Sequence, residues 1–264
     1  MHEVWIGKWK QVTDFSKIKA ALHDLLERTL YFLPFDRYIC VSEATKKDLL
    51  QQKINPQKAV TIYNGFDHHF WNPKKNSKRE AQNLRKKLGL EKKFVCFSWG
   101  RPGSSKGFQY LLKAAPYIQQ HIPNAAILLM LGSPEKYRKN YQQLIRLANR
   151  YPKLVKIIPS LPYRQLGTMI MAADCVVIPS LSEGFGYNAL ETNSLGTPLV
   201  VSDAGSLPEV VSGKHLFFEK KNIPDLAEKI LLVHKRRWNL APTKKFAWDA
   251  CVEAYLKTYS QIIK

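Results

Sequence analysis

Short apolar runs alternate with amphipathic stretches along the chain from residue 94 onward. In the first amphipathic stretch, Phe108, Leu111, Leu112 and Ala115 recur at the spacing of one helix face. Runs that are apolar at every position are typical of strands covered on both sides, as in parallel sheets. The alternation therefore predicts an α/β fold in which βαβ units form a parallel sheet with helices on both faces. The expected strands are Phe94–Trp99, Ala125–Leu131, Leu154–Ile158, Cys175–Ile178, Pro198–Val201 and Leu216–Phe218.

The amino-terminal part of the chain predicts fewer elements. Two helical stretches and two strands are too few for a domain that folds alone. Asn64-Gly65 is a turn signal, and we therefore place a boundary between residues 1–64 and 65–264. The expected elements are a helix from about Asp14 to Leu33, a strand Tyr38–Val41, a helix capped by Ser42 and ending near Gln52, and a strand Ala59–Tyr63.

The chain is strongly basic, with 41 Lys and Arg against 21 acids and a net charge of +20. Such an excess favours an anionic partner: nucleic acid, a phosphate-bearing substrate or an anionic membrane surface. A solvated basic surface without a specific partner is the alternative. The segment Lys74–Lys93 holds nine basic residues and two acids, and it predicts a linker followed by an exposed basic helix around Arg85–Leu88.

The four cysteines, Cys40, Cys96, Cys175 and Cys251, each stand alone. This spacing argues against a disulfide framework or a zinc site and favours a reducing cytosol. The opening residues have no secretory signal. The longest apolar run, Ala125–Leu131, is far below the ~20 residues of a membrane span, so we expect any membrane contact to be peripheral.

The strongest chemical signal is the segment Ser180–Glu191, which follows an apolar run and opens a helix. Gly184 and Gly186 allow a ligand to approach the backbone closely. Free amides at a helix start favour a phosphate. Glu183 and Glu191 lie at opposite ends of this turn and can bind hydroxyls at different points of a long polar ligand. The alternative is an ordinary glycine turn with acids that complement a helix dipole.

A second segment, Gly100–Gly107, also joins a strand to a helix. Arg101 and Lys106 bracket its Gly- and Ser-rich loop, and their charges can converge on a diphosphate. The order of residues matches neither a Walker A loop nor a dinucleotide fingerprint. Both segments are expected at the carboxyl ends of strands, where open α/β sheets bind ligands.

Five motifs in this order resemble glycosyltransferase family 4, whose members have the GT-B fold. They cover nearly the whole chain, and the spacing of Glu183 and Glu191 is that family's hallmark. The resemblance implies a Rossmann-like, donor-binding domain preceded by an incomplete acceptor domain. The motifs are Asp36–Glu43, Tyr63–Asp67, Gly100–Gly107, Pro179–Glu191 and Gly205–Val210.

The resemblance also implies roles. Arg101 and Lys106 match the basic pair that holds the donor diphosphate, and Glu183 matches the carboxylate at the donor sugar. Glu191 matches the carboxylate that binds the ribose. The backbone of Gly184, Phe185 and Gly186, with the helix amides around Asn188, Ala189 and Leu190, matches the donor loop.

By resemblance, the enzyme retains anomeric configuration when it moves a hexose or similar sugar from a UDP- or GDP-sugar to a glycan or lipid-linked acceptor. No Asp-x-Asp pair is present, so neither a metal nor another cofactor is expected. The positive charges would stabilise the leaving diphosphate. A non-catalytic nucleotide-sugar-binding or membrane-associated protein is the alternative.

The beginning of the chain departs from the family pattern. Residues 1–64 resemble only the last third of an acceptor domain, and His2 resembles a family histidine that faces the donor sugar. A frayed terminal histidine is the other interpretation. Three explanations are open. The chain is a fragment, the missing half is a separate polypeptide, or the protein is a shortened form that keeps only donor binding. We favour the fragment. We then expect weak donor binding and little transfer by the chain alone.

Two further features have competing interpretations. His68-His69 suggests a metal, but the neighbouring Phe70 and Trp71 favour a linker pinned to the core. The basic segment Lys74–Lys93, with Lys235–Arg237, fits a protein that docks on the cytoplasmic face of an anionic membrane. Nucleic-acid binding would predict interleaved aromatic residues, which that segment lacks, and we expect no nucleic-acid partner.

Overall fold

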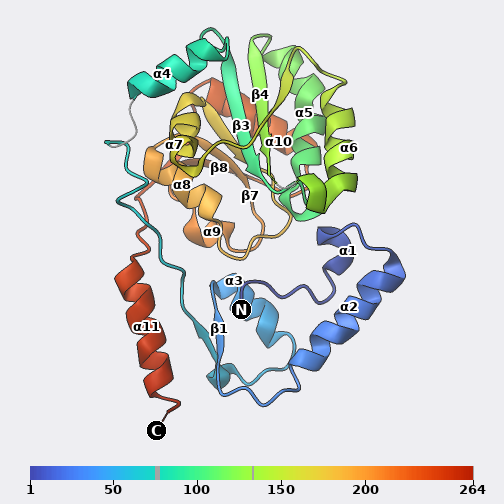
Figure 1. The fold of residues 1–264 in the computed structure, drawn as a ribbon, viewed down its shortest axis with the longest axis vertical. Coiled ribbons are helices and arrows are strands. Elements are labelled where there is room, and N and C mark those ends of the chain that lie inside the picture. Colours follow the sequence, from blue (N-terminus) through green and yellow to red (C-terminus); the bar gives the residue numbers. More distant parts are fainter. Residues whose placement is uncertain (75–77, 133, 264) are drawn as a thin grey trace.

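A seven-stranded sheet forms the centre of the larger lobe (Figure 1). The computed structural model describes residues 1–74, 78–132 and 134–263. The strand order is β5-β4-β3-β6-β7-β8-β9, and every pairing is parallel except that of β8 with β9. The strands are β3 (Phe94–Gly100), β4 (Ala125–Leu131), β5 (Val155–Ile158), β6 (Cys175–Ile178), β7 (Leu199–Ser202), β8 (Gly213–Phe218) and β9 (Asn239–Ala241).

Helices cover both faces of this sheet, as the alternation predicts. Successive residues of a strand point to opposite faces, so Phe97 packs in one core cluster and Cys96 in the other. One face carries α5 (Phe108–His121), α6 (Arg138–Ala148) and α10 (Ile223–His234). The other carries α4 (Lys78–Lys87), α7 (Tyr163–Ala172), α8 (Tyr187–Leu195) and α9 (Leu207–Val210).

The strand order decides where a ligand can bind. The chain builds β3, β4 and β5 outward in one direction, then returns to the middle and builds β6, β7 and β8 in the other. At such a switch point the helices that follow the two central strands lie on opposite faces of the sheet, which leaves a crevice at its carboxyl edge. Here the central strands are β3 and β6, which pair directly.

A smaller lobe lies below this edge of the sheet (Figure 1). Its parallel strands β1 and β2 pair Tyr38 with Ala59, and the carbonyl of Met1 accepts a bond from Val41 N beside them. Val4, Cys40 and Leu49 belong to its own small core. The lobe comprises α1 (Trp9–Val12), α2 (Lys17–Leu30), β1 (Tyr38–Cys40), α3 (Glu43–Leu50) and β2 (Ala59–Thr61).

The chain returns toward the smaller lobe at its end. Phe66 N donates to Phe246 O at 2.8 Å, so the linker after β2 lies against the segment that precedes α11 (Trp248–Ser260). In Figure 1, α11 then runs alongside that linker and down past the smaller lobe. Phe66 and Trp71 are buried, which confirms that aromatic residues pin the linker to the core.

The predicted strands agree closely with the observed ones, with two instructive differences. β8 begins at Gly213 rather than Leu216, because its polar first residues pair with β9. β9 itself was missed, since an exposed edge strand has no apolar run. All four cysteines are free and buried, as expected of small hydrophobic side chains.

The prediction of an exposed basic helix around Arg85–Leu88 was wrong in part. Helix α4 spans Lys78–Lys87, buries Ala81 and contacts α7. The guanidinium of Arg85 donates to Asp174 Oδ2 at 2.9 Å and to the carbonyl oxygen of Ala172 at the same distance. This arginine is thus a fixed structural cation and not a free surface charge. Residues 75–77 of the basic segment lie outside the described residues.

Candidate functional site

The loops after β3 and β6 meet at the switch point of the sheet. Leu181 N donates to Ser105 O at 2.7 Å, which joins the two loops directly. Gly107 has a φ of 65°, and a Cβ atom there would lie 1.8 Å from Pro179 O. Only glycine can therefore occupy position 107 without moving one loop away from the other. The two predicted segments form one crevice.

Lys106 and Glu183 form an ion pair across this crevice. Lys106 Nζ lies 3.1 Å from Glu183 Oε1 and 2.8 Å from Oε2, and Ser180 Oγ also donates to Oε2 at 3.1 Å. The two side chains are 18% and 16% exposed. The carboxylate is thus fixed by two partners, while the ammonium can still offer a hydrogen to an anion in the crevice.

Glu191 is a buried carboxyl group with an unpartnered oxygen. It lies one helical turn inside α8 and is 7% exposed. Burial raises its pKa to about 8, and only the positive charge of Lys106 counteracts this shift. Its Oε2 atom is buried without a hydrogen-bond partner. Orphaned buried carboxylates destabilise a fold, and a ligand hydroxyl that donates to this oxygen would satisfy it.

The start of α8 is held against β3. Gly186 precedes the helix with a φ of 92°, and Asn188 Nδ2 donates to Trp99 O at 3.0 Å. The amides of Ala189 and Leu190 already donate to Gly186 O. Phosphate binding by this helix would consequently fall to the amides that precede Ala189.

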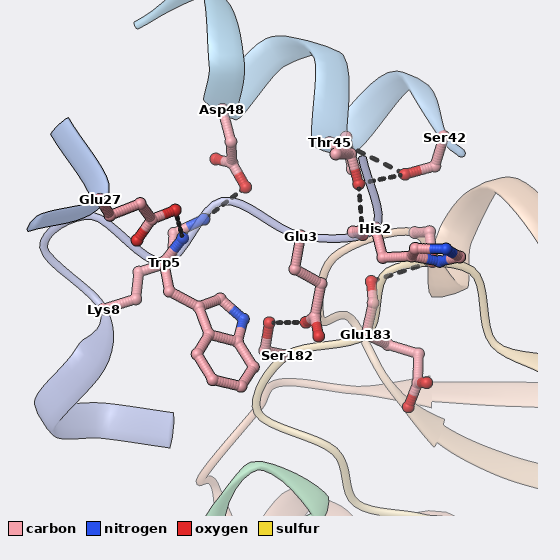
Figure 2. A network of polar contacts seen from close by, with 12 residues as sticks. His2, Glu3, Trp5, Lys8, Glu27, Ser42, Thr45, Asp48, Ser182 and Glu183 are labelled. Carbon is pink, nitrogen blue, oxygen red and sulfur yellow. Dashed lines mark hydrogen bonds and ion pairs between the residues drawn. The ribbon is translucent and has the colours of Figure 1, made fainter. Parts of the chain in front are cut away.

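The smaller lobe contacts the same loop. A Cβ atom at Gly184 would lie 2.2 Å from His2 O, so glycine allows the amino-terminal backbone to pass against the donor loop. Glu3 accepts a hydrogen bond from Ser182 Oγ. Figure 2 shows Glu3 reaching from the smaller lobe to Ser182, with His2 beside Glu183. The amino-terminal residues therefore form one side of the crevice.

A cavity of about 510 Å³ opens between the two lobes next to this crevice. Arg101, Lys106 and Glu183 line it from the larger lobe, and Glu3 and Trp5 line it from the smaller one. The exposed Arg101 therefore faces the same space as the Lys106–Glu183 pair. A cationic crevice of this kind, with a buried carboxylate at one end, fits a ligand with a diphosphate and hydroxyls.

Comparison with known families agrees with this arrangement. The family model for glycosyl transferases group 1 matches residues 80–245, which contain the sheet and both loops. The chain belongs to this family. A second model, Glycosyltransferase Family 4, matches residues 2–70, the smaller lobe.

Curated relatives of this group 1 chain are glycosyltransferases. The D-inositol 3-phosphate glycosyltransferase of Corynebacterium kroppenstedtii is 30% identical over 180 residues, which cover 66% of this chain and 39% of that protein. An uncharacterized glycosyltransferase of Methanocaldococcus jannaschii is 33% identical over 177 residues, or 66% of this chain and 44% of that protein. The chain thus spans less than half the length of these two relatives.

Solved structures with the GT-B fold resemble this chain. Sucrose-phosphate synthase from Thermosynechococcus elongatus superposes with a TM-score of 0.79 at 21% identity, over 99% of this chain and 66% of that one. Anabaena HepE in complex with UDP superposes with a TM-score of 0.71 at 22% identity, over 94% of this chain and 69% of that one. At such identities the likeness establishes the fold alone, and the fold is GT-B.

The structure brings most of the predicted site residues of this group 1 protein together. Lys106, Glu183 and Glu191 lie in one crevice, and Arg101 faces it. Three predicted residues turn their side chains elsewhere. Phe185 is buried in the core among other aromatic rings, so only its backbone can serve a ligand. Ala189 and Leu190 are also buried, and their amides already donate to Gly186 O, so the structure does not offer these two amides to a phosphate.

The sequence analysis assigned no role to one carboxylate that joins the two lobes. Glu209 lies within a quoted motif, and its two oxygens accept bonds from the amides of Glu43 and Ala44 at 2.8 and 2.6 Å. It thereby caps α3 of the smaller lobe from the larger one. Tyr63 also donates to it at 3.0 Å, and burial followed by this bond raises the pKa of Tyr63 to about 12. In the sequence, only the position of Glu209 directly after Pro208 hinted at this capping role.

Neither a metal cluster nor a membrane span is found among residues 1–74, 78–132 and 134–263. No three His, Cys, Asp or Glu side chains gather there to hold an ion. No helix in that part of the chain is long and apolar enough to cross a bilayer. His68 instead accepts a bond from Phe246 N at 3.0 Å, which gives this histidine a structural partner.

Proposed function

We propose that this chain binds the nucleotide-sugar donor of a retaining glycosyltransferase. The observation that carries the proposal is Glu191, a buried carboxyl group whose unpartnered oxygen lies near the Lys106 charge. A ribose has two adjacent hydroxyls that can donate to such an oxygen. A diphosphate attached to that ribose would then reach Lys106 and Arg101. A UDP- or GDP-sugar has all of these groups.

The same charges would promote transfer. Negative charge builds on the leaving diphosphate when the bond between sugar and phosphate breaks. Lys106 and Arg101 line the cavity where this charge would form, and preorganised donors in a partly buried site stabilise such charge strongly. We propose that the first amides of α8 add to them. HepE has been solved with UDP and with UDP-glucose, which supports a uridine donor.

We assign no protein nucleophile to the transfer. Glu183 is fixed by Lys106 and Ser180, and we propose that it accepts hydrogen bonds from the hydroxyls of the donor sugar. Attack by the acceptor on the face of the leaving phosphate would retain the configuration. His2 would face the sugar from the other side of the crevice. Proton NMR of the first product would show the same anomer as the donor, and an inverted product would contradict this mechanism.

Calorimetric titration tests donor binding. We expect one of the UDP-, GDP- or ADP-sugars to bind at one site, and Lys106→Ala and Glu191→Ala each to lower the affinity by about tenfold to a hundredfold, as is typical of lost charged hydrogen bonds. Lys87→Ala removes an exposed lysine far from the crevice and is the matched control. The proposal would be contradicted if the unmodified chain and the three variants bound the donor with equal affinity, or if none of them bound it.

A non-catalytic nucleotide-sugar-binding protein is the second candidate. Donor hydrolysis or transfer measured with radiolabelled donor separates the two functions. We expect weak binding and little turnover from the isolated chain, so robust transfer would contradict that expectation.

We also propose that further polypeptide completes the acceptor lobe. Helix α2 leaves apolar side chains uncovered at helical spacing, with Ile18 83% and Leu22 52% exposed. Helix α11 does the same with Trp248 and Leu256. We expect residues 1–264 alone to bind an apolar dye such as ANS and to associate at high concentration, and Leu22→Lys to weaken both effects. A defined dimer would assign these faces to a second copy instead.

A proposal for the acceptor and the location of the protein starts from its charge. We propose a glycan or lipid-linked acceptor and a peripheral position on the cytoplasmic face of an anionic membrane. The exposed Lys235, Arg236 and Arg237 support this placement. Sedimentation with anionic vesicles, compared with an electrophoretic shift using DNA or RNA, tests it. Binding to nucleic acid without binding to vesicles would contradict it.

A further inference from the structure

A hollow of about 510 Å³ lies at the opposite edge of the sheet from the crevice that holds Lys106 and Glu183. Phe94, the first residue of β3, lines this hollow, whereas Lys106 follows the last residue of the same strand. This edge of the sheet faces away from the smaller lobe (Figure 1). The lining of this basic hollow includes Lys92, Lys93, Phe94, Asn124, Arg236 and Trp238.

The basic hollow has an excess of positive charge. Its two lysines and its arginine form no ion pair with any residue in the ranges 1–74, 78–132 and 134–263. Glu91 and Asp174 are the acids of the lining, and Asp174 is ion-paired with Arg85 at 2.9 Å. With Arg85 included and His234 counted as neutral, four cations face two carboxylates, which leaves an excess of two positive charges. The hollow therefore attracts anions.

The turn that carries the two lysines is fixed by its backbone. Asn124 Nδ2 donates to Lys92 O at 2.9 Å. Arg85 donates through one nitrogen to Lys93 O and, at 3.1 Å, to Leu90 O. An anion that binds here has only the two flexible side chains to order and not the turn itself, which lowers the entropic cost of binding.

Arg236 has an unusual backbone conformation. At the end of α10, Arg236 N donates to Val233 O at 2.9 Å and Arg237 N donates to Leu232 O at 2.8 Å. This pair of bonds places residue 236 where glycine usually ends a helix, and the φ of Arg236 is 56°. The fold would be more stable with glycine at this position. Strain of this kind is typical of residues whose side chains have a function.

Aromatic rings border the cations. Lys214 Nζ lies 5.4 Å from the centre of the Trp238 ring, which is half-buried. The buried ring of Phe94 meets the His234 ring edge-on, with centroids 5.0 Å apart. These rings exclude water from part of the hollow, and an anion is attracted more strongly beside such an apolar surface than in open solvent.

We infer that the basic hollow binds a phosphate group, either of a soluble phosphate ester or diphosphate or of a lipid headgroup. The guanidinium of Arg236 can donate two parallel hydrogen bonds to phosphate oxygens, and the two lysines add point charges. A phosphate with nearly two negative charges matches this set better than a carboxylate does. The inference does not depend on the donor site, because the two sites lie at opposite edges of the sheet and can be occupied together.

Titration with inorganic pyrophosphate tests the inference, followed by proton–nitrogen NMR on the chain in saturating UDP. We expect the indole N–H signal of Trp238, assigned with Trp238→Phe, to shift progressively until the site is full. Acetate at the same ionic strength is the control and should leave this signal nearly unmoved. Because Trp238 lines the basic hollow, its signal reports on this site whether or not UDP fills the crevice.

Two glycine variants make the test specific. Arg236→Gly removes one charge from the basic hollow and relieves the backbone, so we expect the affinity for pyrophosphate to fall by about tenfold or more and the Tm to rise by about 1–4 °C. Lys53→Gly is the matched control, because Lys53 has a φ of 61° and lies outside the hollow. It should raise the Tm by a similar amount and leave the affinity unchanged.

Vesicles that contain phosphatidylinositol 4-phosphate form a second arm of the experiment. Binding to these vesicles that Arg236→Gly weakens and Lys53→Gly does not, without a response to pyrophosphate, would assign the phosphate to a lipid headgroup. An equal loss of affinity in both glycine variants, or a shift with acetate as large as that with pyrophosphate, would show general attraction to a basic surface and would overturn the inference. The absence of a response in both arms would overturn it as well.

Discussion

Glu191→Gln should make the protein more stable at alkaline pH and should weaken donor binding. The side chain is 7% exposed and its Oε2 atom has no partner. Burial disfavours the ionised form and raises the pKa from 4.5 to about 8. Glutamine has nearly the same shape and cannot ionise. The substitution therefore removes the charge without opening a cavity.

The sign and size of the effect follow from proton linkage. Below pH 4.5 the group is protonated in the folded and the unfolded chain, so it contributes nothing to pH dependence. Between pH 4.5 and about 8 the unfolded chain loses this proton while the folded one keeps it, so the free energy of unfolding falls as pH rises. At ~1.4 kcal/mol per pKa unit, the fall reaches at most ~5 kcal/mol, and relaxation around the charge would reduce it to ~2–5 kcal/mol.

Urea denaturation at several pH values measures this directly. We expect the unfolding free energies of Glu191→Gln and the unmodified chain to differ little near pH 5, and the variant to gain ~2–5 kcal/mol over it by about pH 8.5. Glu253→Gln, which changes an exposed acid, is the control and should follow the unmodified chain. Parallel pH profiles for Glu191→Gln and the unmodified chain would refute the claim that this buried carboxyl stays protonated.

Two further predictions concern contacts between loops and lobes. Gly107→Ala should destabilise the fold by ~3 kcal/mol or more in urea denaturation, since its Cβ would overlap Pro179 O. Gly89→Ala has a similar φ of 68° with open space around it, and it should lose only ~1–2 kcal/mol, so equal losses would contradict the close approach. Glu209→Ala should lose ~1–2 kcal/mol and increase amide exchange at the start of α3, because the amides of Glu43 and Ala44 lose their acceptor while Ser42 still caps Thr45. Unchanged exchange there would show that the cap is not maintained in solution.

Local sequence was enough to predict six of the seven strands in the sheet of the larger lobe. The run Ala125–Leu131 is apolar at every position, and its strand has the predicted bounds. Burial on both sides leaves such a pattern in any parallel strand. The basic helix shows the limit of this reasoning. Arg85 looks like a solvated charge in sequence, whereas its guanidinium is fixed by Asp174, which lies far away along the chain.

Sequence by itself determined the chemical groups of the site: the lysine, the two glutamates and the glycine turns. Tertiary structure alone decided their relations. The position of β6 beside β3 brings Lys106 to Glu183, and burial on α8 makes Glu191 a nearly neutral group with a free oxygen. The capping of α3 by Glu209 likewise depends on how the lobes meet. Residue type fixes what a side chain can do, but strand order and burial fix its partners and its charge, and these depend on contacts between distant segments.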